Sequence, residues 1–227
     1  MRNVITFKGE TNLRHGIVVT KLPNIPAPME RGETIVIPGR DGVAWRGEDA
    51  YDPVQLPVEI WVRPRPDLEA VKNWLQGSGE LKINDSPNVW QARVSAGGDY
   101  ILCKFADGWT NTVTFECMPF RYAPDRDLQI LTSPYAIYNP YPIPAQPLLR
   151  VELTGDAEID FCGTAFELFD VTGTVWLDVE LMECYTASGL NNNHMRGEFP
   201  RIPSGRSTVQ WEGGVTGITV TPRWRLR

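Results

Sequence analysis

Apolar and polar residues alternate along much of the chain with the period of two that is typical of half-buried β-strands. The clearest example is the run from Leu56 through Val58 and Ile60 to Val62, which leaves Gln55 and the residues between on the opposite face. Turn-forming pairs such as Pro38-Gly39 and Asp41-Gly42 separate the runs, because glycine adopts positive φ without a Cβ clash. Further strands are predicted at 3–7, 17–22, 34–37, 80–83, 90–94, 100–105 and 111–118, the last two forming a hairpin closed by Asp107-Gly108.

Residues 66–76 break the β pattern and predict a short helix. Pro66 suits the first helical position, Asp67 and Glu69 favour the positive end of the helix dipole, and Gly77 suits the position just after the last turn. One apolar stripe is expected to pack against the neighbouring sheet, formed by Leu68, Val71, Trp74 and Leu75.

Six prolines between residues 124 and 147 mark a change in composition. Proline lacks the N–H group that a strand donates to its neighbour, so the sequence predicts an extended connector at 129–147 between domains at 1–128 and 148–227. In the second domain, short apolar runs predict strands at 148–153, 157–161, 166–171, 174–181, 207–211 and 217–225. Two antiparallel sheets packed as a sandwich would bury their alternate residues.

Composition excludes several classes of protein. The 227 residues are 42% hydrophobic and 22% charged, as in an ordinary globular chain, and the net charge of −6 gives no cationic field for nucleic acid. The amino terminus alternates apolar and polar residues where an export signal would be continuously apolar, so we expect synthesis in the cytoplasm. No apolar run approaches the roughly 20 residues that a membrane helix needs.

The four cysteines, at 103, 117, 162 and 184, are too far apart for a Cys-x-x-Cys metal site. Each lies in a β-rich stretch, which favours buried free thiols. A disulfide between Cys103 and Cys117 across the predicted hairpin is the alternative.

No motif for catalysis, metal or cofactor binding is evident, and neither histidine, His15 or His194, lies in one. His194 belongs to a polar loop that is expected to turn the chain. Asp178 lies between Leu177 and Val179, so it faces either the solvent or a buried hydrogen-bond partner. Carboxylate pairs for glycoside hydrolysis could be assembled from Asp156, Glu158, Asp160, Asp178 and Glu180, but 28 acidic residues produce such pairs by chance.

The order of several segments resembles a known family. The segments IVIPGRDG (35–42), QLPVEIWV (55–62), NWLQGSGEL (73–81) and NTVTFECMPFRY (111–122) look like the amino-terminal domain of siphophage distal tail proteins. The segments YNPYPIPAQPLLRVELTG (138–155), WLDVELMECY (176–185) and GEFPRIPSGRSTVQWEGGVTGITVTPRWR (197–225) look like the galectin-like carboxy-terminal sandwich of that family.

The resemblance implies a mainly β protein, with an amino-terminal β-sandwich or split barrel that carries one helix and a galectin-like second domain. It implies a structural subunit of a phage or prophage tail tip, at the distal end of the tail in the virion, and not an enzyme. Such subunits form a homohexameric ring that joins the tail tube protein to the fibre or lysin hub and to receptor-binding parts.

The loop at 39–53 combines arginine and aromatic residues, which are common in protein interfaces. Its candidate contacts between subunits are Arg40, Asp41, Trp45, Arg46 and Tyr51. The alternative is an exposed loop with Trp45 folded back onto its own domain.

A second hypothesis is a host-glycan-binding module of the adsorption device, since a sugar can stack on an aromatic side chain such as Trp176 or Trp211. Polar residues also gather between Asn191 and Arg196, around His194. Because fold alone does not supply a site, this hypothesis depends on how these residues lie in the structure.

Overall fold

The computed structural model describes residues 3–63, 68–103 and 108–227. The chain divides into two compact units, the first reaching Tyr122 and including Arg227, the second covering 123–226. Both are built from antiparallel strands, and the described residues contain one α-helix, so the prediction of a mainly β fold is confirmed.

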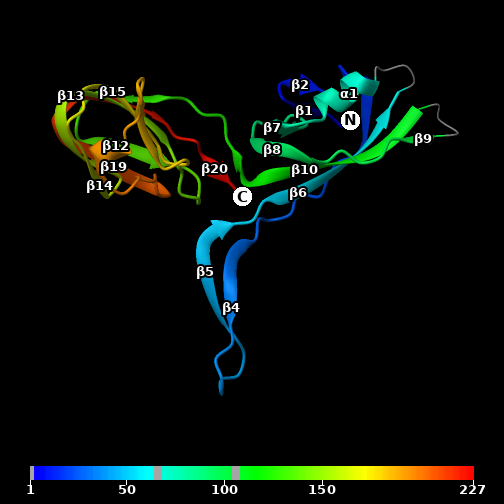
Figure 1. The fold of residues 1–227 in the computed structure, drawn as a ribbon, viewed down its shortest axis with the longest axis horizontal. Helices are drawn as coiled ribbons and strands as arrows, with labels where there is room; N and C mark the ends of the chain where they lie inside the picture. The colour runs from blue at the N-terminus through cyan, green and yellow to red at the C-terminus, as the bar shows by residue number, and fades with distance from the viewer. Residues whose placement is uncertain (1–2, 64–67, 104–107) are drawn as a thin grey trace. The chain divides into compact units, whose positions relative to one another are not determined.

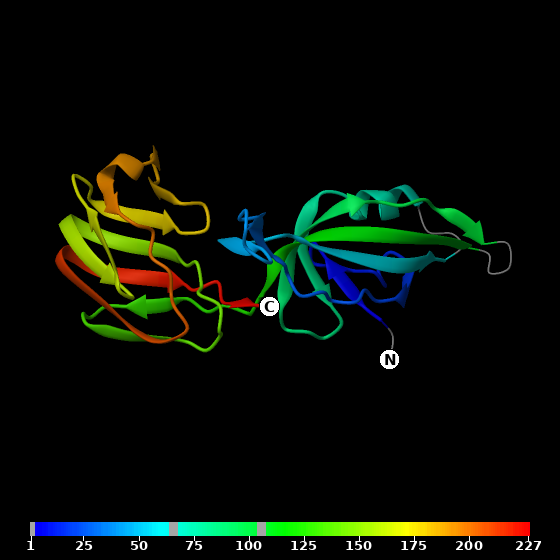
Figure 2. The same cartoon turned by 90° about the horizontal axis from the view of Figure 1, so that it is seen from below.

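The first unit contains a curled sheet in the order β2-β1-β7-β8-β10-β6-β3, with β9 also paired to β10, and a separate hairpin of β4 and β5. The long strands β6 and β10 run side by side (Figure 2). The elements are β1 (Ile5–Phe7), β2 (Glu10–Thr11), β3 (Ile17–Lys21), β4 (Glu30–Ile35), β5 (Ala44–Tyr51), β6 (Val54–Val62), α1 (Leu68–Trp74), β7 (Ser78–Ile83), β8 (Val89–Ala96), β9 (Ile101–Cys103) and β10 (Gly108–Tyr122).

The core of the first unit lies between the sheet and α1. The alternate residues predicted to face inward from β6 are buried, and the apolar stripe of the helix packs against them. Trp74 fixes the helix by donating its indole N–H to the carbonyl oxygen of Phe7 at 3.0 Å, and Gly77 has a φ of +73° just after the helix. The predicted start of the helix at Pro66 and Asp67 lies outside the described residues.

The strand pairing predicted at 100–118 is present, since β9 and β10 pair with Cys103 opposite Gly108, while Asp107 of the predicted turn lies outside the described residues. This register places Cys103 roughly 30 Å along the strand from Cys117, at ~3.3 Å per residue. The Cys103–Cys117 disulfide is therefore wrong, and Cys117 is a buried free thiol, as is Cys184, while Cys162 is half-buried and free. Burial raises the pKa of Cys117 to about 12.

The second unit contains two layers that share the long strands β13 and β19. One layer has the strand order β11-β19-β13-β15-β16-β17. In the other layer, β12 pairs with β19, β14 pairs with β13, and β18 pairs with β14. The elements are β11 (Leu128–Ile130), β12 (Tyr135–Asn139), β13 (Leu148–Phe161), β14 (Thr164–Leu168), β15 (Gly173–Asp178), β16 (Glu183–Thr186), β17 (Gly189–Leu190), the 3-10 turn η1 (Asn192–His194), β18 (Met195–Gly197), β19 (Gly205–Thr221) and β20 (Arg225–Leu226).

The predicted connector at 129–147 differs from the structure, which places β11 and β12 in this stretch, both paired with β19. The prolines that motivated the prediction lie at the ends of these two strands or outside them. Strand ends and sheet edges tolerate proline, because no N–H is needed there. Residues 123–147 are thus part of the second unit.

Glycines allow β13 and β19 to pass from one layer to the other. Both strands change register between Leu153 and Ala157, where Gly213 and Gly214 of β19 face Gly155 and Asp156. A Cβ on Gly214 would lie 2.5 Å from the backbone nitrogen of Gly155, whereas a Cβ on Gly155 would meet nothing within 4 Å. The bend therefore requires glycine at 214 but not at 155.

We predict that Gly214→Ala lowers the free energy of unfolding by about 1–3 kcal/mol, because two backbones must move apart at the bend. Gly155→Ala is the matched control and should change it by less than about 0.5 kcal/mol. Urea unfolding followed by tryptophan fluorescence measures both. Equal effects of the two substitutions would show that close backbone approach does not set the bend.

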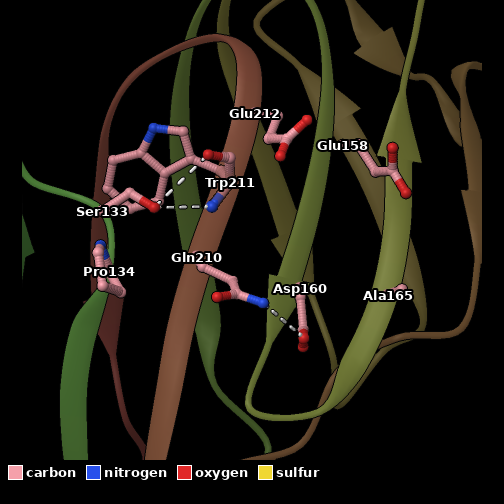
Figure 3. A pocket seen from close by; sticks show the side chains of 8 residues that line it. All are labelled: Ser133, Pro134, Glu158, Asp160, Ala165, Gln210, Trp211 and Glu212. Atoms are coloured by element: carbon pink, nitrogen blue, oxygen red, sulfur yellow. Dashed lines mark hydrogen bonds between the residues drawn. The ribbon is translucent and has the colours of Figure 1, made fainter.

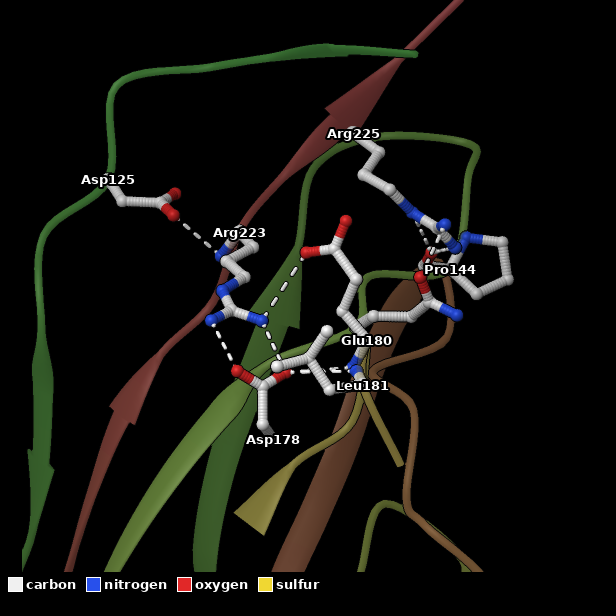
Figure 4. Close-up of polar contacts among 8 residues, drawn as sticks. Asp125, Pro144, Asp178, Glu180, Leu181, Arg223 and Arg225 are labelled. Atoms are coloured by element: carbon white, nitrogen blue, oxygen red, sulfur yellow. Dashed lines mark hydrogen bonds and ion pairs between the residues drawn. The ribbon is translucent and has the colours of Figure 1, made fainter. Parts of the chain in front are cut away.

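A network of ion pairs and hydrogen bonds holds residues 223–225 within the second unit (Figure 4). Arg223, with a φ of +53°, donates to both carboxylate oxygens of Asp178 at 2.7 and 2.8 Å and to Glu180 at 3.4 Å. The backbone N–H of Arg223 donates to Asp125, and Arg225 donates to the carbonyl oxygen of Pro144 at 2.9 Å. Asp178, whose orientation the sequence left open, is buried with a partner.

Burial alone would raise the pKa of Asp178, but hydrogen bonds from Arg223 and from the N–H of Leu181 outweigh it and hold the pKa below the ordinary 3.8. A carboxylate with a lowered pKa stabilises the fold above its unfolded-state value and loses this contribution as the pH falls through the folded-state value. Burial raises the pKa of Asp125, although backbone N–H groups of Trp224 and Arg223 oppose it. Protonation of Asp125 therefore favours the fold as the pH falls.

We predict that Asp178→Asn lowers the free energy of unfolding at pH 7 by about 1–3 kcal/mol. The effect is smaller than for a fully buried pair because the side chain of Arg223 is 24% exposed. Glu167→Gln, which removes the exposed pair with Arg196, is the control and should have little effect.

The difference between Asp178→Asn and the wild type should shrink as the pH falls below about 4, because the unfolded carboxylate is protonated first and the native carboxylate follows at still lower pH. Denaturant unfolding at a series of pH values measures it. A difference that stays constant from pH 7 to pH 2 would contradict the assigned role of the ion pair.

Candidate assembly surface

Strands β4 and β5 form a hairpin that projects away from the sheet of the first unit (Figure 1). We call residues 29–52 the arm. The two strands pair only with each other, with Gly32 opposite Gly47 and Ile35 opposite Ala44. A hairpin of two strands has no interior, so the arm has no core of its own.

Backbone contacts define both ends of the arm. At its base, the N–H of Asp52 donates to the carbonyl oxygen of Met29 at 2.8 Å, and Arg31 pairs with Asp52 at 2.8 Å. At its tip, the N–H of Arg40 donates to the carbonyl oxygen of Ile37 at 3.2 Å, and Gly39 has a φ of +80°. Proline followed by a positive-φ glycine is typical of a type II turn.

Large apolar side chains are exposed along the arm. The exposed fraction is 72% for Val36 and 60% for Val43, next to the tip. The full set is Met29, Ile35, Val36, Ile37, Val43 and Trp45. Exposed apolar side chains gathered on one hairpin make it a candidate surface for contact with another molecule.

The five residues predicted to contact a neighbouring subunit all belong to the arm. Arg40 and Asp41 are exposed in the turn, and Arg46 lies 3.9 Å from Glu33 in an exposed ion pair across the strands. Tyr51 lies at the base, where its ring packs edge-on against Phe120 with the centroids 5.1 Å apart. Tyr51 therefore anchors the arm to the sheet more than it offers a free surface.

Trp45 lies against its own hairpin, and its contact with a neighbouring subunit stays a prediction. Its indole lies over Gly32 of the facing strand, where a Cβ would come within 2.6 Å of the ring. The side chain therefore folds back onto its own hairpin. It is still 57% exposed, so one part of the indole remains available to a partner.

Two features of the arm differ from the prediction. Residues 39–53 were expected to be a loop, but 44–51 form strand β5, and the preceding strand is 30–35 instead of 34–37. A hairpin exposed on both faces needs no apolar alternation, so the pattern used to find strands is absent. The exposed Val36 was not predicted, although three consecutive apolar residues at 35–37 cannot all face one side of a strand.

The two tryptophans proposed for glycan binding lie in different surroundings. Trp211 is partly buried against the core of the second unit, and its backbone N–H and carbonyl both contact the Ser133 hydroxyl. A cavity of about 330 Å³ beside it is lined mainly by polar side chains, including Asp160, which accepts a hydrogen bond from Gln210 (Figure 3). Figure 3 shows the indole extending to the other side of the strand from Gln210.

Trp176, by contrast, stacks on Tyr185 with the ring centroids 5.7 Å apart and an interplanar angle of 8°. Both residues alternate along their strands with the buried Leu177 and Cys184, which places the pair on the outer face of the sheet. Arg150 lies opposite Trp176 in the sheet. The stacked rings are the better platform for a sugar.

The remaining polar clusters have structural partners. The His15 ring stacks on Trp74 at 4.5 Å and contacts Glu10 at 2.7 Å, and a ring nitrogen of His194 lies 3.1 Å from the carbonyl oxygen of Phe169. Within the described ranges, no group of three His, Cys, Asp or Glu side chains could hold a metal ion. No helix among those residues is long and apolar enough to cross a membrane.

No family model and no curated protein matches the sequence. The fold, however, matches solved phage structures. A crystal structure of the SPP1 Dit protein, described as a paradigm of the hub adsorption apparatus in phages that infect Gram-positive bacteria, aligns with a TM-score of 0.74 at 13% identity, over 97% of this chain and 99% of that one.

Two structures of the phage p2 baseplate in its activated conformation, one with strontium and one with calcium, align with a TM-score of 0.51 at 6% identity. The alignments cover 96% and 97% of this chain and 97% of each matched chain. At these identities the likeness establishes the fold, which extends over both units in the same order.

Proposed function

We propose that the chain is a distal tail protein, a structural subunit of a siphophage tail tip or baseplate that performs no catalysis. Its copies form a homohexameric ring at the end of the tail tube. One face of the ring binds the tube protein, and the other binds the fibre or lysin hub and the receptor-binding parts. The protein would then be part of the virion, at the distal end of the tail.

The observation that carries this proposal is the combination of a shared fold and an uncovered arm. Both units align with the SPP1 Dit protein over nearly their whole length, while the arm exposes apolar side chains that its own unit does not cover. Burying one such side chain contributes about 1–3 kcal/mol. Contact with another subunit would bury the side chains that the two-stranded hairpin leaves exposed.

The charges of the arm also suit an interface between proteins. Arg46 pairs with Glu33 and Arg31 pairs with Asp52, so these two of the arm's three arginines are already matched, and Arg40 is exposed in the turn. A polar rim of paired charges around an apolar centre is the usual composition of an interface core and its surroundings. Arg40 and Trp45 are the residue types that most often dominate binding.

We predict that the double variant Arg40→Ala and Trp45→Ala weakens self-association, raising the dissociation constant at least tenfold, because a tryptophan anchor in an interface is worth about 2 kcal/mol or more. Light scattering over a dilution series measures the mass. Negative-stain images of the wild type should show sixfold rings with an open centre.

Tyr138→Ala is the matched control, since Tyr138 is an equally exposed aromatic residue of the second unit. It should leave the mass unchanged. A double variant that assembles exactly as the wild type does would show that these two arm residues lie outside the interface, and a wild type that stays monomeric at high concentration would contradict the ring.

A second candidate function is binding of a host glycan by the second unit, and the stacked pair of Trp176 and Tyr185 favours it. Beside the rings, Glu152 accepts a hydrogen bond from Thr174 at 2.8 Å and pairs with Arg150 at 2.6 Å. Aromatic faces flanked by hydrogen-bonding groups without net charge suit a neutral sugar.

If this candidate is right, calorimetric titration with purified cell-wall polysaccharide from a Gram-positive host will release heat with the wild type, and Trp176→Ala will abolish it. Tyr138→Ala should bind as the wild type does. Absence of heat and of chemical-shift changes at high polysaccharide concentration would remove the candidate while leaving the structural role intact.

A further inference from the structure

The first unit also contains a cavity that could receive the apolar side chains of an arm. A cavity of about 420 Å³ opens on the sheet where β10 changes register against β8, between Cys117 and Arg121. Little side-chain bulk fills it, because Gly79, Ala92 and the buried Cys117 contribute to its lining. Met118, which is 46% exposed, forms part of its wall.

The charged groups of this cavity are already paired. Arg93 and Glu116 approach to 2.6 Å, and the Nε of Arg93 donates to the same carboxylate at 2.9 Å. An apolar side chain entering the cavity would therefore leave no charge buried without a partner. The exposed aliphatic side chains of Val36, Ile37 and Val43, on either side of the turn that carries Arg40 and Asp41, have matching chemistry.

The arm of the same molecule does not reach this cavity. Pro53, which lines the cavity, directly follows the base of the arm in the sequence. The hairpin of β4 and β5 projects away from the sheet that contributes most of the lining residues (Figure 1). Eight residues of β5 at ~3.3 Å each place the tip roughly 25 Å from the base. An apolar arm tip that binds in this cavity must therefore come from another molecule.

We propose that the tip of the arm binds in the cavity of a second copy of this chain, at the base of that copy's own arm. Each molecule then offers one tip and one cavity, and the contact is head-to-tail. Repeated head-to-tail contacts close into a ring when the rotation between copies permits it. The inference rests on the proposed function and adds the partner surface that receives the arm.

A disulfide cross-link between two single variants tests this arrangement in the full chain. Val36→Cys places a thiol at the tip, and Met118→Cys places one at the wall of the cavity. After mild oxidation of the mixture, we expect a covalent dimer in at least tenfold higher yield than from Val36→Cys mixed with Ser188→Cys, an exposed turn residue of the second unit. The double variant with both substitutions should form a ladder of larger covalent oligomers.

Native Cys117 lines the cavity, but burial raises its pKa to about 12, so it is largely protonated and reacts slowly. Val36→Cys mixed with the wild type measures the contribution of Cys117.

Equal yields with the Met118→Cys and Ser188→Cys partners, or a dimer formed between two Val36→Cys tips, would overturn the proposal. If the wild type has the mass of a ring in light scattering and forms rings in negative-stain images, but the cross-link does not form, only the assignment of the cavity is contradicted. If no oligomer forms, the ring and the cavity assignment both fall.

Discussion

A hairpin of two strands cannot bury the side chains that it carries, and this constraint governs how the molecule is used. The arm residues whose burial is described are all exposed or partly exposed, yet Val36, Val43 and Trp45 are as apolar as residues of the sheet core. In a monomer this surface remains in contact with water. In the proposed assembly, a neighbouring molecule would cover this surface.

Contacts at its base join the arm to the rest of the first unit. Tyr51 at the base of the arm packs against Phe120. The helix α1 packs on the sheet and is held there by the hydrogen bond from the Trp74 indole to Phe7. In the second unit, glycines at the bend of β13 and β19 and the ion pair between Arg223 and Asp178 fix the sandwich and the end of the chain. The carboxylate of Asp178 and the indole N–H of Trp74 both have hydrogen-bond partners within their own units.

The parts of the fold that sequence could predict are those where one face is buried and the other is not. The alternation from Leu56 to Val62 and the stripe that includes Val71 and Trp74 are of this kind, because a single core imposes the period. Strand β5 has no such period, since both of its faces are exposed. The prolines before Leu148 indicated a connector, but edge strands tolerate proline at their ends, so β11 and β12 were missed.

The candidate site was predictable in part for the same reason. Arginine and tryptophan identified the arm by residue type, whereas the exposure of Val36 and the position of Trp45 over Gly32 depend on how the two strands pair. The partner of Asp178 was beyond reach, because Arg223 lies 45 residues away and only the folded sandwich brings the two together.

The central claim, that the arm is covered by assembly, is tested most directly by amide hydrogen exchange of residues 29–52 in the dilute isolated chain and in assembled tail tips. The account predicts fast exchange around 36–43 in the dilute chain and strong protection of the same amides in the assembly. Equally fast exchange in both states would contradict it.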